Sequence, residues 1–168
     1  MKNRFPGFNT YLAILLGLTA GCKLMPHQDP VRIALFIEMT PDNTGRNGPM
    51  TIGRTDPFVI NVENQPFLDE RSVMSASVAD AFGSYQITVQ FDRRGTWLLE
   101  QYSVANRGRR IAIVAHFGEE GRSLAAPVIQ KPIHDGFLVF TPDATREEAE
   151  RIAKGLNEQG KAIQKDNL

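Results

Sequence analysis

The sequence predicts an α+β fold in which a mainly antiparallel sheet carries two helices on one face. The first observation is residues 85–91 (YQITVQF), where apolar and polar residues alternate as in a strand with one buried face. The second is a pair of segments, 92–106 and 145–160, whose apolar residues recur at helical spacing. Since predicted strands precede and separate these segments, packing both helices on one face is the economical way to bury their apolar stripes.

Residues 1–21 differ in character from the rest of the chain. Lys2 and Arg4 give a basic start, and residues 11–20 (YLAILLGLTA) are apolar or small. A membrane-spanning helix needs about 17–25 such residues, so this run is too short and is typical of a secretory signal peptide. Its removal leaves two more acidic than basic residues, which argues against a protein that binds nucleic acid.

Cys22 is the only cysteine and directly follows this segment. The stretch Leu18-Thr19-Ala20-Gly21-Cys22 resembles the lipobox of bacterial lipoproteins, with the leucine one position further out than in the commonest pattern. The resemblance implies that Cys22 is acylated, becomes the first mature residue and holds the protein to a membrane through lipid. The alternative is a free cysteine beside an ordinary cleavage site. The residue after Cys22 is Lys23 and not the acidic residue of an inner-membrane retention signal. This favours a periplasm-facing location on the outer membrane.

The chain beyond the signal divides into segments of different character. They are a tether at 22–30, N-terminal strands and a loop at 31–66, an α+β domain at 67–160 and a tail at 161–168 that is expected to fray. Turn formers at 41–49 and at 117–123 predict a surface loop and a turn. Residues 66–73 predict a helical turn or a loop.

The predicted strands are rich in β-branched and aromatic residues. In chain order they are 31–40, 50–54, 58–63, 73–81, 85–91, 109–116, 124–133 and 136–140. Pro127 and Pro132 make segment 124–133 either an edge strand or a broken one, because proline cannot donate a ladder hydrogen bond.

Both helices have capping signals. Asp92 is a good N-cap for a helix that runs to about Asn106, and Gly108 stands where a C-terminal cap belongs. Thr145 and Glu148 form a capping box at the start of the last helix. The residues predicted to face the core are Leu98, Leu99, Tyr102 and Ala105 in the first helix and Ala149, Ile152, Ala153 and Leu156 in the second. Favourable i,i+4 ion pairs are expected at Glu147–Arg151 and Glu150–Lys154.

From Phe67 onward, several short stretches occur in a specific order. They are FLDERSVMSASV, ITVQFDRRGTWLLEQYSVANRGRRIAIV, AAPVIQKPIHDG and FTPDATREEAERIAKGL. This order is similar to the head subdomain of the periplasmic region of SecD, an export-accessory membrane protein. The resemblance implies a ferredoxin-like α+β head that contacts exported polypeptide. SecD also has transmembrane helices that couple it to proton flow, and these have no counterpart here, so its mechanism does not transfer with its fold.

The sequence contains no catalytic or metal-binding signature. Ser123 lies one residue away from a G-x-S-x-G elbow, with His134 and Asp135 downstream, but a strand is predicted where the elbow needs a helix. Ser123 is more simply a turn residue. The three histidines lack metal-ligand spacing, so we expect no enzyme, metal or cofactor.

Three features are candidates for binding a partner. Trp97 lies off the main stripe of its helix and is expected to be half exposed, either at the rim of the core or in contact with a partner. Pro127 marks an open sheet edge where a strand could add. Basic residues are also expected at the two ends of that helix, namely Arg93, Arg94, Arg107, Arg109 and Arg110. They form either a solvated rim or a contact for anionic headgroups or an acidic partner.

Two functions fit these features. The first is a non-enzymatic, lipid-anchored envelope protein whose head binds exported polypeptide or another envelope protein. The alternative is a structural envelope lipoprotein without a role in translocation.

Overall fold

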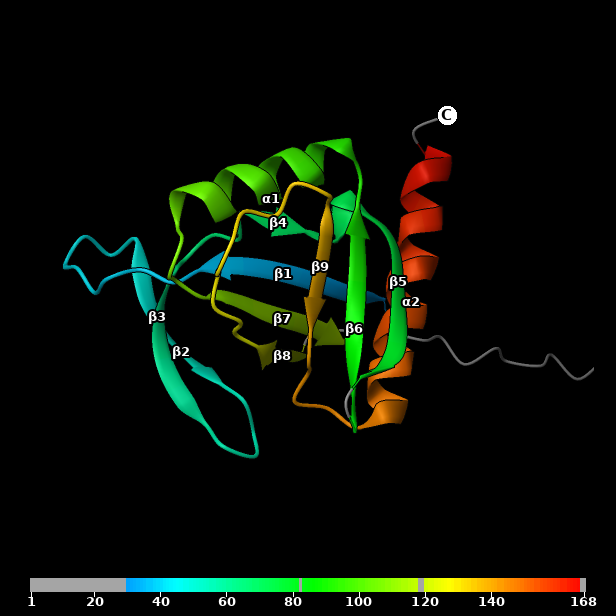
Figure 1. Ribbon diagram of the computed structural model, residues 1–168, viewed down its shortest axis with the longest axis horizontal. Coiled ribbons are helices and arrows are strands. Elements are labelled where there is room, and N and C mark those ends of the chain that lie inside the picture. The colour runs from blue at the N-terminus through cyan, green and yellow to red at the C-terminus, as the bar shows by residue number, and fades with distance from the viewer. Residues whose placement is uncertain (1–29, 82, 118–119, 167–168) are drawn as a thin grey trace, which may run out of the picture.

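The computed structural model describes residues 30–81, 83–117 and 120–166 (Figure 1). The strands in this part of the chain are β1 (Val31–Ile37), β2 (Asn47–Ile52), β3 (Phe58–Glu63), β4 (Leu68–Asp69), β5 (Val73–Ala81), β6 (Ser84–Phe91), β7 (Ile111–Phe117), β8 (Glu120–Ala125) and β9 (Phe137–Phe140). The helices are a 3-10 turn η1 (Glu70–Ser72), α1 (Arg93–Ala105) and α2 (Arg146–Asp166). All strand pairs among the described residues are antiparallel, which confirms the predicted fold class.

The centre of the fold is a four-stranded sheet with the order β4-β1-β7-β8. Strands β1 and β7 pair along their whole length, from Val31 opposite Phe117 to Ile37 opposite Ile111. One face of this pair enters the main core through Ile33, Leu35, Ile37, Ile111, Ile113 and Ala115. The other face is also covered, which explains why β7 is a continuous apolar run rather than an alternating one.

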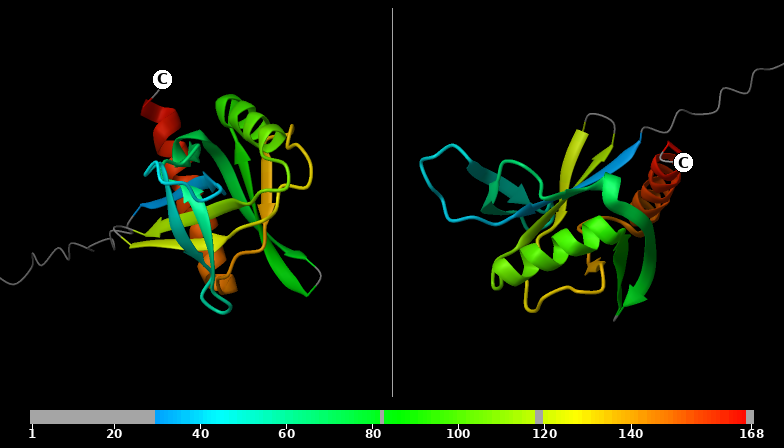
Figure 2. Two further views of the ribbon diagram at one scale, coloured as in Figure 1. Left: turned by 90° about the vertical axis from the view of Figure 1, so that its left-hand side faces the viewer. Right: turned by 90° about the horizontal axis from the view of Figure 1, so that it is seen from above.

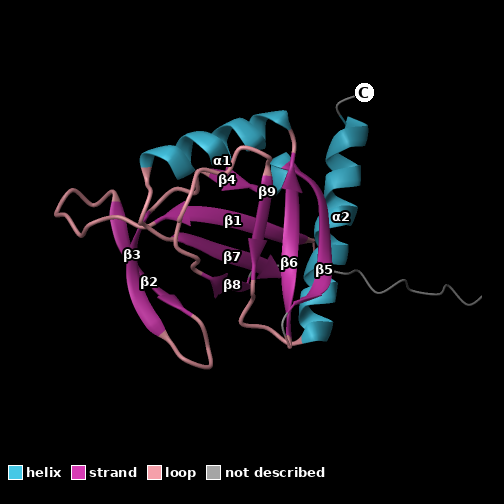
Figure 3. Ribbon diagram, in the orientation of Figure 1, coloured by secondary structure: helices cyan, strands magenta, loops and turns pink. Residues whose placement is uncertain are grey.

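A second sheet, with the order β5-β6-β9, runs crosswise in front of the first in Figure 1. The predicted alternation of β6 is confirmed, because Ile87, Val89 and Phe91 are buried and point into the main core. Both helices contribute to the same core, α1 through Leu99 and α2 through its apolar stripe. The two helices and the second sheet therefore lie on one side of the four-stranded sheet (Figure 3).

Strands β2 and β3 form a hairpin that we call the arm. It projects along the far left of Figure 1 and packs on the opposite face of the four-stranded sheet. This contact is a separate, small apolar cluster that contains Ile52, Ile60, Val62, Ala112 and Ala126. The arm therefore depends on fewer apolar contacts than the rest of the fold.

Helix α1 begins as predicted, but its C-cap is Asn106 rather than Gly108, which follows two residues later with a φ of 84°. The Asp92 carboxylate accepts a 2.7 Å hydrogen bond from the Gly95 N–H, and the helix ends at Ala105 with Asn106 as its C-cap. The predicted core stripe is partly wrong, because Ala105 is exposed and Ser103 is fully buried. The Ser103 hydroxyl donates to the Glu100 carbonyl and accepts from the Ile133 N–H, so a polar side chain fits inside.

Helix α2 also begins as predicted. The N–H of Glu148 donates to the Thr145 hydroxyl, and the N–H of Thr145 donates back to the Glu148 carboxylate, which confirms the capping box. All four predicted stripe residues are buried. The helix continues through Gly160 to Asp166, because residue 160 packs against β5 instead of beginning a tail. Its i,i+4 ion pairs are Arg146–Glu150 and Lys154–Glu158 rather than those expected.

The region between β7 and β9 differs most from the sequence prediction. Residues 120–123, predicted as a turn, belong to β8, and only the first two residues of segment 124–133 are in a strand. The ladder is interrupted at Pro127, in agreement with the broken-strand alternative. Beyond it the chain stays beside β7 only through single hydrogen bonds, such as Ile129 N–H to the Arg109 carbonyl at 2.8 Å.

Candidate functional site

A groove of about 660 Å³ opens between the arm, the end of β8 and strand β9. We call it the edge groove. The residues that line it are Ile52, Gly53, Thr55, Asp56 and Phe58 of the arm, Gln86 of β6, Arg110 and 124–127 near β7 and β8, and 139–143 from β9 onward. In Figure 1 the end of β8 lies between the arm and β9.

Strand β9 forms one wall of this groove and is the last strand of its sheet. The Phe91 N–H donates to the Gly136 carbonyl, which fixes the phase of the β6–β9 ladder. Because hydrogen-bonding direction alternates along an antiparallel strand, Leu138 directs its backbone groups toward β6. Phe137 and Val139 direct theirs away from β6, toward the free edge. The Phe137 N–H is bound by the Asp135 carboxylate, whereas no described strand pairs with Val139 on that side.

The groove continues along the rest of β9. A second hollow of about 210 Å³ is lined by residues 127–131, Ile133, Leu138 and Val139, together with Ile111. Pro127 and Val139 line both hollows, so the two are adjacent. Large apolar side chains near them are unusually exposed, namely Val139 (47%), Val128 (42%), Phe58 (41%) and Phe137 (40%). An open strand edge with apolar side chains beside it suits an extended polypeptide.

Arg110 places a positive charge at the floor of the edge groove. Its guanidinium carbon lies 5.3 Å from the centre of the Phe58 ring, and its Nη1 donates to the Ala126 carbonyl at 2.9 Å. Its backbone N–H donates to the Glu38 carboxylate at 2.8 Å. These contacts hold the Phe58 ring and the end of β8 together across the groove floor.

Asp143 closes the other end of the groove. Its carboxylate accepts hydrogen bonds from the N–H of Arg54 and from both the N–H and the hydroxyl of Thr55, at 3.3 and 3.0 Å for Thr55. The hydrogen bond from the Arg54 backbone, followed by those from Thr55, lowers the pKa of Asp143 from its ordinary value of 3.8. We call this contact between the arm and the β9–α2 loop the latch.

Two further contacts attach the arm on the same side. The Ser123 hydroxyl donates to the Thr51 carbonyl at 2.8 Å and accepts from the Gly53 N–H at 3.2 Å. Glu148 at the start of α2 forms ion pairs with Arg54 at 3.2 Å and Arg122 at 3.0 Å. The arm wall is therefore held by polar contacts as well as by its small apolar cluster.

The predicted binding residues fall into two groups. Pro127 and Arg110 line the edge groove. Arg109 lies two residues before β7, and its Nη1 donates to the Glu38 carbonyl at 3.4 Å. Arg93, Arg94, Trp97 and Arg107 belong to α1 and the turn after it, and none of them lines the groove. The structure therefore does not bring these candidates together into one site.

Several groove residues were missed by sequence reasoning. Phe58 lies in a predicted strand on the same face as Ile60 and Val62, yet it is exposed because it lies outside the apolar cluster that buries those two residues. Val139 lies in a predicted strand, but nothing in the neighbouring sequence shows that this strand lies at the edge of a sheet. Asp143 sits in a turn-like stretch where an aspartate is ordinary.

The residues of the elbow-like stretch and the histidine downstream of it are engaged separately. Ser123 lies in β8 rather than in a turn, and its hydroxyl is bound to the backbone of β2. His134 Nδ1 lies 2.8 Å from Glu100 Oε1, on α1. Within the described residues no three potential metal ligands gather, and neither helix combines the length and apolarity needed to cross a bilayer. Cys22, the signal segment and most of the tether lie outside the described residues.

Comparison with known proteins gives a consistent result. Residues 42–160 match the family model "SecDF, P1 head subdomain", a match that begins earlier than the resemblance noted from Phe67. The chain is 36% identical over 77 residues to the protein translocase subunit SecDF of Thermus thermophilus. These residues are 46% of this chain but only 10% of that protein.

Solved structures of SecDF share the fold. A structure described as a membrane component SecDF that enhances protein export superposes with a TM-score of 0.55 at 25% identity, covering 77% of this chain and 63% of that one. A structure of SecDF in a super-membrane-facing form superposes with a TM-score of 0.57 at 24% identity, covering 77% of this chain and 19% of that one.

Proposed function

Because the chain belongs to the SecDF P1 head subdomain family, we propose that it is a non-enzymatic envelope protein that binds extended polypeptide segments during protein export. The link to export comes from the relatives, one of which is described as enhancing that process. The chain spans about a tenth of its curated relative, so the proposal concerns the head alone and not the motor activity of a whole translocase subunit.

The free edge of β9 is the observation on which the proposal depends. A bound segment would pair with the outward N–H and C=O groups of Val139 and extend the sheet β5-β6-β9 by one strand. Its alternate side chains would then face Phe58 and the exposed side of β9. Main-chain pairing recognises any extended segment, which suits a protein that meets many exported chains.

We further propose that the head works outside the cytoplasm, held to a membrane by acylation of Cys22. The support is the signal-like segment and the lipobox-like stretch that ends at this cysteine. Mass spectrometry of the protein from intact envelopes should find Cys22 modified at its sulfur and N-terminal in the mature chain. A free thiol on an uncleaved chain contradicts the anchor without affecting the groove.

The groove is tested by one substitution in the full chain. Val139→Pro removes the outward N–H, while pairing with β6 through Leu138 is kept, since an edge strand tolerates proline where its N–H faces away from the sheet. We expect about a five- to tenfold weaker affinity for a permanently unfolded probe, reduced and alkylated lactalbumin, because a main-chain bond of about 1 kcal/mol is lost and the ring obstructs approach.

Val139→Thr is the matched control, because it keeps the N–H and the β-branched shape, and its affinity should equal that of the unsubstituted chain. Equal affinity of the proline and threonine variants contradicts strand addition at β9. Failure of the unsubstituted chain to bind any unfolded probe favours a structural envelope lipoprotein instead.

A further inference from the structure

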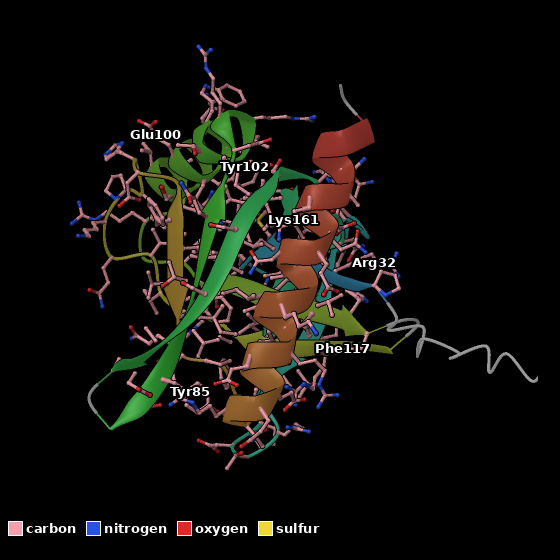
Figure 4. All side chains as sticks on the ribbon, turned by 90° about the vertical axis from the view of Figure 1, so that its right-hand side faces the viewer. Arg32, Tyr85, Glu100, Tyr102, Phe117 and Lys161 are labelled. Carbon is pink, nitrogen blue, oxygen red and sulfur yellow. The ribbon has the colours of Figure 1, made fainter. Side chains whose placement is uncertain are left out.

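The outward face of α1 carries an apolar centre between positive charges. Trp97 and Val104 are each 55% exposed, and the helical wheel places them on the side opposite the buried Leu99 and Ser103. A shallow hollow on this side is lined by Trp97, Glu100, Gln101, Val104 and Ala105. Figure 4 looks along α1 and shows Tyr102, which stacks on Phe67, on the side nearer the sheets. More than half of the Trp97 surface is therefore open to solvent.

The positive charges on this face lack carboxylate partners. Arg93 and Arg94 lie in the first turn of α1 and Arg107 follows its last turn, and all three are exposed. No carboxylate of the described residues lies within ion-pair distance of these guanidinium groups. Arg107 uses only its Nε, which donates to the Gln130 carbonyl at 3.1 Å.

The acidic groups around α1 are already engaged. Asp92 caps the helix through Gly95, and Glu100 contacts His134. Asp69 is bound by Arg71, whose hydrogen bonds, aided by the charge of Arg94, lower the pKa of that carboxyl. Asp92 and Glu100 keep their negative charges in these contacts, so the face carries a small positive excess because Arg93, Arg94 and Arg107 outnumber them.

We propose that this face of α1, which we call the α1 face, docks on the surface of a bilayer that contains anionic phospholipid. Arginines bind the phosphate and glycerol headgroups, while Trp97 and Val104 enter the boundary between headgroups and acyl chains. Tryptophan is the side chain that most favours this boundary. One face of a 13-residue helix is also small for a stable protein interface, so a lipid surface is the better fit.

The length of the tether is consistent with this arrangement. Seven residues lie between Cys22 and Pro30, where the described chain begins, so the distance from Cys22 to Pro30 is at most about 29 Å when the chain is extended. A head anchored at Cys22 therefore stays within about one domain diameter of the bilayer. The α1 face is outside the edge groove, so docking leaves the free edge of β9 open to a polypeptide.

Trp97 is the only tryptophan, so its fluorescence reports on the α1 face alone, whatever the N-terminal segment does. The full chain is reconstituted with vesicles of phosphatidylcholine, or of equal parts phosphatidylcholine and phosphatidylglycerol. With the anionic vesicles we expect a blue-shifted emission, protection from acrylamide and quenching by lipids brominated on their acyl chains. Molar salt should reverse all three, because it screens the arginines.

The variant Arg93→Gln/Arg94→Gln tests the charges. The ratio of protected to accessible Trp97 should fall about 30-fold on anionic vesicles, since each arginine near such a surface contributes about a fivefold factor. The matched control Arg151→Gln/Lys161→Gln removes two exposed charges from α2 and should leave the ratio unchanged. Figure 4 shows Lys161 on α2, away from α1.

Three results would overturn docking. The first is that Trp97 stays accessible to acrylamide although the protein co-floats with the anionic vesicles. That result would leave the Cys22 anchor intact and contradict docking of the α1 face. The second is equal protection on neutral and anionic vesicles. The third is protection by polyglutamate without vesicles, which would assign the face to an acidic polypeptide.

Discussion

At the scale of single residues, the latch shows how one carboxylate fixes a wall of the edge groove. Asp143 receives three hydrogen bonds from two consecutive residues of the arm, Arg54 and Thr55. All three favour the ionised carboxylate, which is why its pKa is lowered. The arm is therefore held most firmly when Asp143 is charged.

This coupling predicts a pH dependence of the arm. The pKa of Asp143 is lower in the folded state than its ordinary value of 3.8. The stabilisation by the charged carboxylate is therefore complete at pH values above 3.8. It is lost as the pH falls from 3.8 through the lower pKa of the folded state. Amide resonances of Arg54 and Thr55 should shift together in that acidic window in an NMR titration. In Asp143→Asn the shift should vanish, and a shift that persists there would show that another group controls the arm.

Residue exposure was only partly accessible from the sequence. Helical spacing placed Leu99 inside and Trp97 off the core stripe, as the structure has them. It could not show that Ser103 would be buried, because that depends on the Ile133 N–H, thirty residues away, which binds its hydroxyl. Likewise, the arginines of the α1 face could be listed from the sequence, but not that none of them forms an ion pair with a carboxylate of the described residues.

At the scale of elements, α2 is placed by a close approach to β1. A methyl group at position 155 would lie 2.6 Å from Val31 Cβ and closer still to Cγ2, well inside van der Waals contact. Glycine in mid-helix costs about 1 kcal/mol relative to alanine, so its presence here reflects packing rather than helix propensity.

We therefore expect Gly155→Ala to destabilise the protein, although it improves helix propensity. The free energy of unfolding should fall by about 1–2 kcal/mol, because the clash of the new methyl group with Val31 destabilises the protein more than the better helix propensity of alanine stabilises it. Chemical denaturation measures it. In the Val31→Ala background the same substitution should cost less or become favourable, whereas equal costs in both backgrounds would mean that the contact with β1 is not responsible.

Capping and periodicity explain why some elements could be predicted and others could not. Asp92, Thr145 and Glu148 act through residues up to three positions away, so the sequence showed both helix starts. The end of α2 and the course of segment 124–133 depend on distant partners, β5 and β7. Local sequence patterns carry no information about such contacts. The predicted end of α2 is therefore wrong, and the sequence leaves two alternatives for the course of segment 124–133.

At the scale of the whole molecule, two apolar clusters lie on opposite faces of the four-stranded sheet, one stabilising the body and the other the arm. The main cluster joins both larger sheets and both helices, while the cluster under the arm has only five buried residues in the described chain. The left-hand view of Figure 2 shows the arm in front of β1 and β7, on the opposite side of the four-stranded sheet from the main core. The sequence predicted the α+β class, but the separation into two clusters requires knowing which face of β1 and β7 each strand covers.

This division predicts that the arm opens without global unfolding. Backbone amides of β2 and β3 should exchange with deuterium faster than those of β1 and β7, because fewer apolar contacts must break. Ile52→Ala, which removes a side chain that is only 2% exposed in the arm cluster, should lower the opening free energy of the arm by about 2–4 kcal/mol and leave exchange in β1 and β7 nearly unchanged.

Ile87→Ala provides the contrast, because Ile87 is fully buried in the main core. It should accelerate exchange in β1, β7 and the arm together, since global unfolding becomes easier for all of them. If Ile52→Ala has this same global effect, the arm and the body form one cooperative unit, and the edge groove has a rigid wall. If the arm opens alone, the groove can widen beside β9 while the sheet that would receive an added strand stays folded.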